Sequence, residues 1–187
     1  MLTEQYWMVG GGVAVVVLLG LLLGSIWRRR RRPQAVQILR TASLETAHDV
    51  LLPNGMGGQI HIEHLLLTAQ GLVVIDSKDF VGRIFGSDLM DEWTVIGPEG
   101  RYTFPNPQMR LYDRVAAVRR LVRDDVPVQG HVLFSPGADF SGGRPTTVIL
   151  PEEFAERYQK PDKAELEELQ EALQPHWDRI KQIWQAA

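Results

Sequence analysis

The chain has 187 residues, with 20 Lys and Arg against 23 Asp and Glu, and it contains no cysteine. This length suits one domain of ordinary size with a short appendage and leaves little room for two catalytic domains. The absence of cysteine excludes disulfide frameworks, thiolate zinc sites and cysteine nucleophiles.

An uncharged apolar segment lies close to the start of the chain. Residues 7–27 read W-M-V-G-G-G-V-A-V-V-V-L-L-G-L-L-L-G-S-I-W, long enough to cross a hydrocarbon core of about 30 Å. Trp7 and Trp27 flank it, and five arginines follow at residues 28–32. We therefore expect a transmembrane helix at residues 7–27, residues 1–6 outside the cytoplasm and the rest in the cytoplasm. A signal peptide would instead carry its basic residues before the apolar run.

The remainder of the chain is acidic. From Pro33 onward, 15 basic residues stand against 22 acidic ones, a net charge of −7. Such a domain is not a general polyanion binder, because phosphate contacts need clustered Lys and Arg. Any contact with nucleic acid must be local, and the candidate residues are five arginines that share one predicted helix: Arg110, Arg114, Arg119, Arg120 and Arg123. A solvated helix face explains these arginines equally well.

Residues 59–78 predict a β-hairpin. The run Q-I-H-I-E-H-L-L-L-T-A-Q-G-L-V-V-I-D-S-K has two apolar halves and a Gly-containing turn, as two tightly joined antiparallel strands do. If the chain turns on Ala69 and Gln70, residues whose numbers sum to 139 face each other. Glu63 then lies opposite Asp76, about 5 Å away.

Three charges interrupt this apolar hairpin. Asp76 and Lys78 share a face because side chains alternate along a strand, whereas Ser77 points the other way. Two carboxylates as close as Glu63 and Asp76 repel unless a proton or a cation lies between them, and a hard divalent metal such as Mg²⁺ is a usual solution. A register shifted by one residue would place Glu63 on the other face. A purely structural ion pair between Asp76 and Lys78 remains an alternative.

The other predicted elements complete a mixed sheet. A basic juxtamembrane segment at residues 28–47 precedes a domain at residues 48–160 and a helical C-terminal segment at residues 161–187. We expect strands at residues 48–53, 80–85, 93–96, 128–135 and 146–150, and helices at residues 106–123 and 162–184. In the last helix the inward residues are Leu166, Leu169, Leu173, Trp177, Ile180 and Trp184, with a break or kink at Pro175. The strand, helix, strand order predicts a crossover, hence an α/β or α+β fold with a mixed central sheet flanked by helices.

An ordered set of motifs resembles the nuclease-related domain (NERD) family. The motifs span roughly residues 49–134 and comprise I-E-H at 62–64, G-L-V-V-I-D-S-K at 71–78, G-R-I-F-G at 82–86, Trp93, and N-P at 106–107. Glu63 stands where the family has Asp, and Asp76 stands where it commonly has Glu. Both carboxylates and the step of 13 residues between them are therefore kept.

The resemblance implies a restriction-endonuclease-like fold and a metal-dependent nuclease distantly similar to PD-(D/E)XK enzymes. Glu63, Asp76 and Lys78 would be its catalytic residues, acting on phosphodiester bonds of DNA or RNA. Glu63, Asp76 and the backbone carbonyl of Ser77 would bind Mg²⁺ or Mn²⁺, and Lys78 would orient the attacking water. His61 and His64 are adjacent polar candidates, although a strand histidine is more often a core or supporting group.

The chain departs from the family pattern before its first strand. Family members have a longer helix there, with a Gly-Glu pair whose acid completes the metal site, but residues 34–46 contain no such pair, and Glu45 is their only carboxylate. In addition, Arg110 and Leu111 stand where members often have Gln-Asn. The alternative function is therefore a catalytically inactive, membrane-tethered binding or scaffold module that keeps the nuclease-like fold.

Overall fold

The structure is a computed structural model that describes residues 37–185, beginning with a helical turn at residues 37–42. The strands are β1 (Glu45–Pro53), β2 (Gln59–Thr68), β3 (Gly71–Lys78), β4 (Gly82–Phe85), β5 (Glu92–Gly97), β6 (Gly100–Pro105), β7 (Val128–Phe134), β8 (Ala138–Asp139) and β9 (Val148–Ile149). The helices that follow the first turn are α2 (Gln108–Arg119), α3 (Pro151–Arg157) and α4 (Lys163–Gln185).

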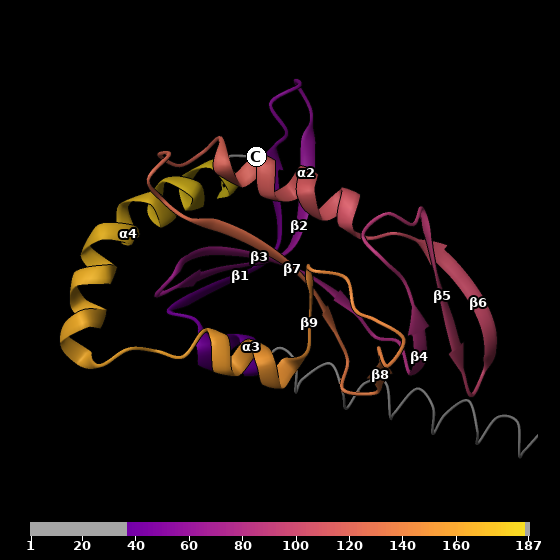
Figure 1. The fold of residues 1–187 in the computed structure, drawn as a ribbon. Helices are drawn as coiled ribbons and strands as arrows, with labels where there is room; N and C mark the ends of the chain where they lie inside the picture. The colour runs from indigo at the N-terminus through magenta and orange to yellow at the C-terminus, as the bar shows by residue number, and fades with distance from the viewer. Residues whose placement is uncertain (1–36, 186–187) are drawn as a thin grey trace, which may run out of the picture. The chain divides into compact units, whose positions relative to one another are not determined.

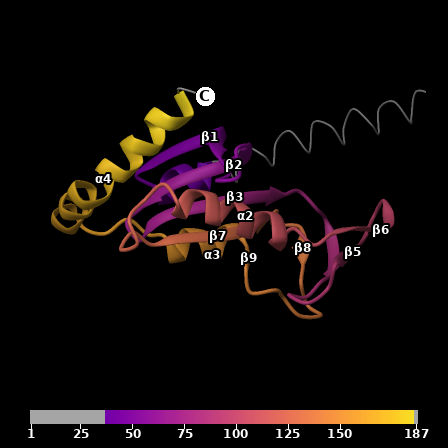
Figure 2. The same cartoon turned by 90° about the horizontal axis from the view of Figure 1, so that it is seen from above.

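The strands form two sheets. The main sheet has the order β1-β2-β3-β7-β9, in which β1, β2 and β3 pair antiparallel and β3, β7 and β9 pair parallel. The second sheet has the order β6-β5-β4-β8. It lies at the opposite end of the main sheet from α4 (Figures 1 and 2). These described elements confirm the predicted mixed α+β fold and the predicted parallel pairing, which joins β7 to β3 after α2.

Helices cover both faces of the main sheet (Figure 1). Neighbouring residues of β7 show this, because adjacent side chains of a strand point to opposite faces. A Cβ atom added at Gly130 would come within 2.5 Å of Val115 on α2, whereas the side chain of His131 hydrogen bonds to Tyr158 immediately after α3. Gly130 therefore allows α2 to approach β7 closely.

The hairpin register is the predicted one. The β2–β3 partners run from His64 with Ile75 to Thr68 with Gly71, and each pair of numbers sums to 139. The chain turns on Ala69 and Gln70. A short turn fixes the register of the strands it joins, so this feature could be read from local sequence.

Several elements differ from the prediction. β1 begins three residues earlier than expected, α2 ends at Arg119 rather than Arg123, and β6, β8 and α3 were not predicted. α3 does carry a start signal, because Pro151 opens the helix, Glu152 and Glu153 follow, and the Glu153 side chain accepts the backbone N–H of Leu150. β6 is almost entirely exposed, so it lacks the apolar pattern by which strands are predicted.

The C-terminal helix docks onto β1 through Glu45. The carboxylate of Glu45 accepts hydrogen bonds from Gln174 (2.6 Å) and Trp177 (2.7 Å), and it pairs with Lys181 (2.6 Å). Trp177 and Ile180 are fully buried. α4 continues through Pro175 as one element, so the helix is not broken there.

The predicted transmembrane helix at residues 7–27 lies outside the described residues, as does the arginine block. Among the helices within residues 37–185, none is both long and apolar enough to cross a membrane.

The Glu45 contacts predict a pH-dependent contribution to stability. Burial tends to raise the pKa of Glu45, but the hydrogen bonds and the charge of Lys181 bring it below its ordinary value. A lowered carboxyl pKa stabilises the fold above the unfolded value of about 4.3, and this contribution is lost as pH falls through the folded pKa. Glu45→Gln should therefore cost about 1–2 kcal/mol at pH 7, measured by thermal melting, and much less at pH 3.

Glu156→Gln is the matched control, because Glu156 is exposed on α3. Its melting temperature should follow that of the unsubstituted chain at both pH values. An equal loss for Glu45→Gln at pH 7 and pH 3 would contradict the proposed role of the charge.

Candidate functional site

The site lies where β2 separates from β3. The last β2–β3 pair on this side is His64 with Ile75, whereas β3 stays paired with β7 as far as Lys78 with Phe134. The ladder therefore ends just before Glu63 and Asp76. Because β2 and β3 separate here, the side chains of Glu63 and Asp76 have room beside β3.

Asp76 is a buried carboxylate in the centre of the main sheet, with 2% of its surface exposed. Its Oδ2 atom forms an ion pair with Nη1 of Arg114 on α2, while its Oδ1 atom is buried and has no hydrogen-bond partner among the described residues. Burial raises the pKa of Asp76 above its ordinary value, and the charges of Arg114 and Lys78 only partly oppose this effect. Asp76 therefore holds a proton more readily than a solvated aspartate does.

Arg114 turns toward the sheet instead of facing solvent. Its side chain is 18% exposed, and its Nε atom donates a hydrogen bond of 2.7 Å to the backbone carbonyl of His61. A solvated helix face, one of the two alternatives for the five arginines, does not describe Arg114. Helical spacing could have shown this, because position 114 falls within the apolar stripe formed by Leu111, Val115 and Val118.

The other candidate arginines of this segment make separate contacts and do not gather into one cluster. Arg119 donates to the carbonyl of Val128, Arg120 donates to the carbonyl of Asn54, and Arg123 pairs with Asp125. Arg110 is exposed on α2.

Glu63 bridges the gap between the separating strands. Its Oε2 atom accepts the backbone N–H of Ser77 at 2.9 Å, and its Oε1 atom lies 3.5 Å from Nε2 of His64. Burial tends to raise the pKa of Glu63, but the hydrogen bonds from His64 and Ser77 and the charge of Lys78 lower it overall. The contacts of Glu63 thus favour its ionised form, whereas burial disfavours the ionised form of Asp76.

The charge of Lys78 acts on both acids. Its positive charge acts to lower the pKa of both Glu63 and Asp76. Its Nζ atom is 3.3 Å from the backbone carbonyl of Ser77, the carbonyl that the family resemblance implies as a metal ligand. The structure therefore brings the three predicted catalytic side chains and this carbonyl to one end of β3.

The two predicted histidines occupy different surroundings. His64 hydrogen bonds to Ser77 Oγ (3.1 Å) and to the ring of His48 (2.7 Å), so it supports the strand carrying Asp76. His61 pairs with Asp49 at 3.0 Å, and both side chains are well exposed. Asp49 has a φ of 52°, a left-handed conformation that a residue other than glycine seldom adopts. Sequence reasoning gave His48 and Asp49 no role.

The residues fit a metal only in part. Oδ1 of Asp76 offers an oxygen that lacks a partner, and Glu63 supplies a second carboxylate beside it. Within residues 37–185, however, no three His, Asp or Glu side chains are close enough together to bind an ion. Glu45, the only carboxylate at residues 34–46, is held by α4.

Comparisons with known proteins identify the family of this chain. Residues 33–135 match the family described as the nuclease-related domain, which is more than half of the chain. An uncharacterized protein of Bacillus anthracis is 26% identical over 89 residues, which is 48% of this chain and 42% of that protein. The chain thus spans less than half the length of this curated relative. A search of the solved structures found no match. The matched segment contains β1, β2, β3, α2 and β7, and the chain belongs to the nuclease-related domain family.

Proposed function

We propose that this chain is a metal-dependent nuclease that hydrolyses phosphodiester bonds of DNA or RNA, with Glu63, Asp76 and Lys78 as its catalytic residues. The observation that supports this function is the buried Oδ1 atom of Asp76, which has no hydrogen-bond partner among the described residues. An unpaired buried acceptor is costly for the fold. Such a cost is typical of a site that is completed by a ligand.

Mg²⁺ or Mn²⁺ is the ligand that these oxygen atoms suit. Asp76 and Glu63 would hold it, with the Ser77 carbonyl as a further oxygen ligand. A bound divalent ion would lower the pKa of a water molecule and stabilise charge on the phosphate. Lys78 would orient that water, because its Nζ atom lies beside the Ser77 carbonyl. The restriction-endonuclease-like core that carries these residues would consist of β1, β2, β3, α2 and β7.

Arg114 regulates this site in the proposal. Its guanidinium neutralises Asp76 and lies within the space beside the acids. Arg114 would therefore compete with a divalent ion for Asp76, and protonation of Asp76 would also oppose binding. The lowered pKa of Glu63 keeps the second acid ionised for this purpose.

The alternative is a catalytically inactive binding or scaffold module that keeps the fold. Two observations favour it: Arg114 already supplies the charge that Asp76 requires, and Glu45 is engaged with α4.

Both functions share one further proposal, namely that residues 7–27 tether the domain to the cytoplasmic face of the cell membrane. They differ in whether a metal binds, which a thermal shift can measure.

The nuclease proposal predicts a coupled loss of metal binding and cleavage. In the full-length chain, millimolar Mn²⁺ should raise the melting temperature by several degrees, and single-stranded or duplex DNA or RNA should be cut. Asp76→Asn and Glu63→Gln should each abolish both effects, because each removes a charged ligand. Lys78→Met should reduce cleavage by a factor of about 100 or more while leaving the metal-induced shift in place.

Glu156→Gln serves again as the control and should retain both metal binding and cleavage. Cleavage that survives in both Asp76→Asn and Lys78→Met would remove these residues from the mechanism. A melting temperature that no divalent ion changes would favour the scaffold function instead.

Asp76→Asn should not lose stability at pH 7. Since burial raises the pKa of Asp76, its ionised form is disfavoured in the folded state, so stability increases as pH falls through the folded pKa. The neutral Asn should therefore melt at or above the temperature of the unsubstituted chain without metal. A clear drop in melting temperature would mean that the ion pair with Arg114 outweighs the cost of burial.

Arg114→Gln tests the proposed competition between the guanidinium and the metal. Removing the cation should raise the pKa of Asp76 further, so the pH at which Mn²⁺ stabilisation is half-maximal should move upward. Above that pH the Mn²⁺-induced shift should be larger, because the competing charge is gone. Arg110→Gln, on the exposed face of α2, should change neither quantity. An unchanged midpoint for Arg114→Gln would contradict the competition.

A further inference from the structure

A second candidate site lies beside the open edge of β7, away from the flank of α2 that carries Arg114. Two cavities of about 490 and 320 Å³ meet there, and they share Thr146 and Arg157 in their walls. The larger cavity lies against α2 and the start of β7, and the smaller one lies between β9 and α3. None of the residues that form the candidate metal site lines either cavity.

The edge of β7 is unpaired along the larger cavity. β9 pairs with β7 only at Val132 and Leu133, and the backbone N–H of Val132 bonds to Thr147 on that side. Residues two apart in a strand direct their backbone groups to the same side. The N–H and C=O of Gly130, which lines the cavity, therefore point toward the open edge and are available to a ligand.

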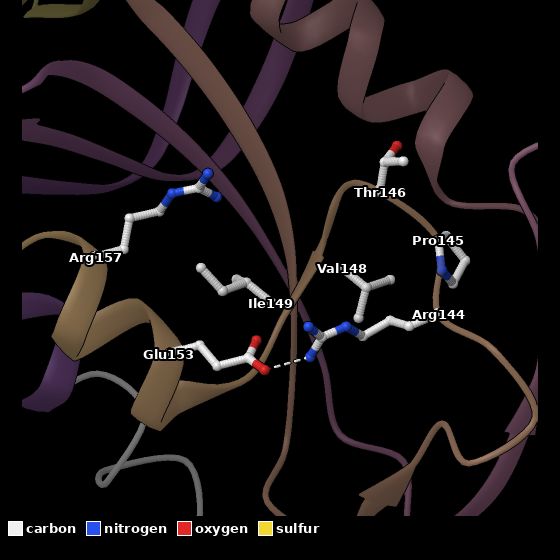
Figure 3. Close-up of a pocket in the computed structure, with 7 residues that line it drawn as sticks. All are labelled: Arg144, Pro145, Thr146, Val148, Ile149, Glu153 and Arg157. Atoms are coloured by element: carbon white, nitrogen blue, oxygen red, sulfur yellow. Dashed lines mark hydrogen bonds and ion pairs between the residues drawn. The ribbon is translucent and has the colours of Figure 1, made fainter.

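Two arginines give the larger cavity a positive charge. Arg119 and Arg157 line it, and none of its lining residues is Asp or Glu. In the smaller cavity Arg144 is neutralised by Glu153 at 2.5 Å. Figure 3 shows that the Arg157 guanidinium extends away from this pair, and Arg157 forms no ion pair with any described residue. Its charge is therefore available to an anionic ligand.

The charge of Arg157 also acts on His131, a buried residue that lines the larger cavity. His131 is 6% exposed and hydrogen bonds to the Tyr158 hydroxyl at 2.7 Å. Burial, and secondarily the charge of Arg157, lower the pKa of His131 to about 4. His131 is thus a neutral polar group at physiological pH, and it leaves the arginines as the cations of the site.

The opposite wall is apolar and includes an aromatic ring. Leu111, Tyr112, Val115 and Ala116 project from α2 along the larger cavity, and Tyr112 is 48% exposed. An exposed aromatic ring provides a surface on which a base can stack. The amide of Gln129, also in the lining, can hydrogen bond to the edge of such a base.

We propose that this groove binds a nucleoside monophosphate, with the base against the α2 wall and the phosphate at Arg157 and Arg119. A guanidinium is the side chain best suited to a phosphate monoester, because its donors match two phosphate oxygens. Asp88 lies nearby, but its carboxylate accepts hydrogen bonds from the backbone and hydroxyl of Thr146 and does not line the cavities. The site is separate from the proposed metal chemistry and does not depend on it.

Calorimetric titration of the full-length chain with adenosine monophosphate in EDTA tests this assignment. Adenosine monophosphate should bind at least about tenfold more tightly than either adenosine or inorganic phosphate, because it contacts both walls. Arg157→Gln should weaken its binding about tenfold or more, as expected for loss of a charge-assisted contact. Ala116→Leu narrows the apolar side of the cavity with another good helix former. It should weaken the binding of adenosine monophosphate and leave the affinity for inorganic phosphate unchanged.

Two control variants test whether the nucleotide binds at this groove. Arg179→Gln removes an exposed arginine of α4 and should not change the affinity. Asp76→Asn should also bind the nucleotide normally, which separates this site from the proposed nuclease site. Unchanged binding in Arg157→Gln would overturn the assignment. So would inorganic phosphate binding as tightly as adenosine monophosphate, since that result would indicate a cationic surface without a base pocket.

Discussion

A buried aspartate at the end of the central strand determines how the rest of the domain is arranged. Asp76 loses its hydration beneath α2, and the guanidinium of Arg114 compensates for only part of that loss. For the ion pair to form, α2 must lie across β3 and β7 at close range. Gly130 permits this approach because it has no side chain to meet Val115. The buried charge of Asp76 is thus accommodated by three features together: the crossover that places α2 over the sheet, the glycine at position 130 and the guanidinium of Arg114.

Local sequence could predict the hairpin but not the partners of its charges. The turn at Ala69 and Gln70 and the apolar runs on either side set the register, which the structure confirms. The partner of Asp76 comes from 38 residues further along the chain, and the three groups that hold Glu45 come from the C-terminal helix. Such contacts depend on how elements pack, which periodicity does not describe. The inward direction of Arg114 follows from its position within an apolar stripe, but its pairing with Asp76 does not.

The shortest elements of the fold are also the hardest to predict from sequence patterns. β8 and β9 have two residues each, too few to show alternation, and α3 was missed although a proline and two acids mark its start. These small pieces shape the groove beside β7. Because β9 is so short, the Gly130 edge stays open, and α3 directs Arg157 toward it. A second ligand site therefore depends on the elements that sequence patterns describe least well.

The difference between a nuclease and an inactive scaffold reduces here to which cation accompanies Asp76. A guanidinium neutralises one carboxylate oxygen and leaves Oδ1 unpaired, whereas a divalent ion could contact oxygens of both acids. The opposite pKa shifts of Glu63 and Asp76 suit such an exchange, because burial disfavours the charge of Asp76 unless a cation accompanies it, whereas the contacts of Glu63 favour its charge. In the proposal, Arg114 balances the charge of Asp76 when no metal is bound and is displaced when one binds. The same ion pair is therefore compatible with both functions, and the free energy of exchanging the two cations decides between them.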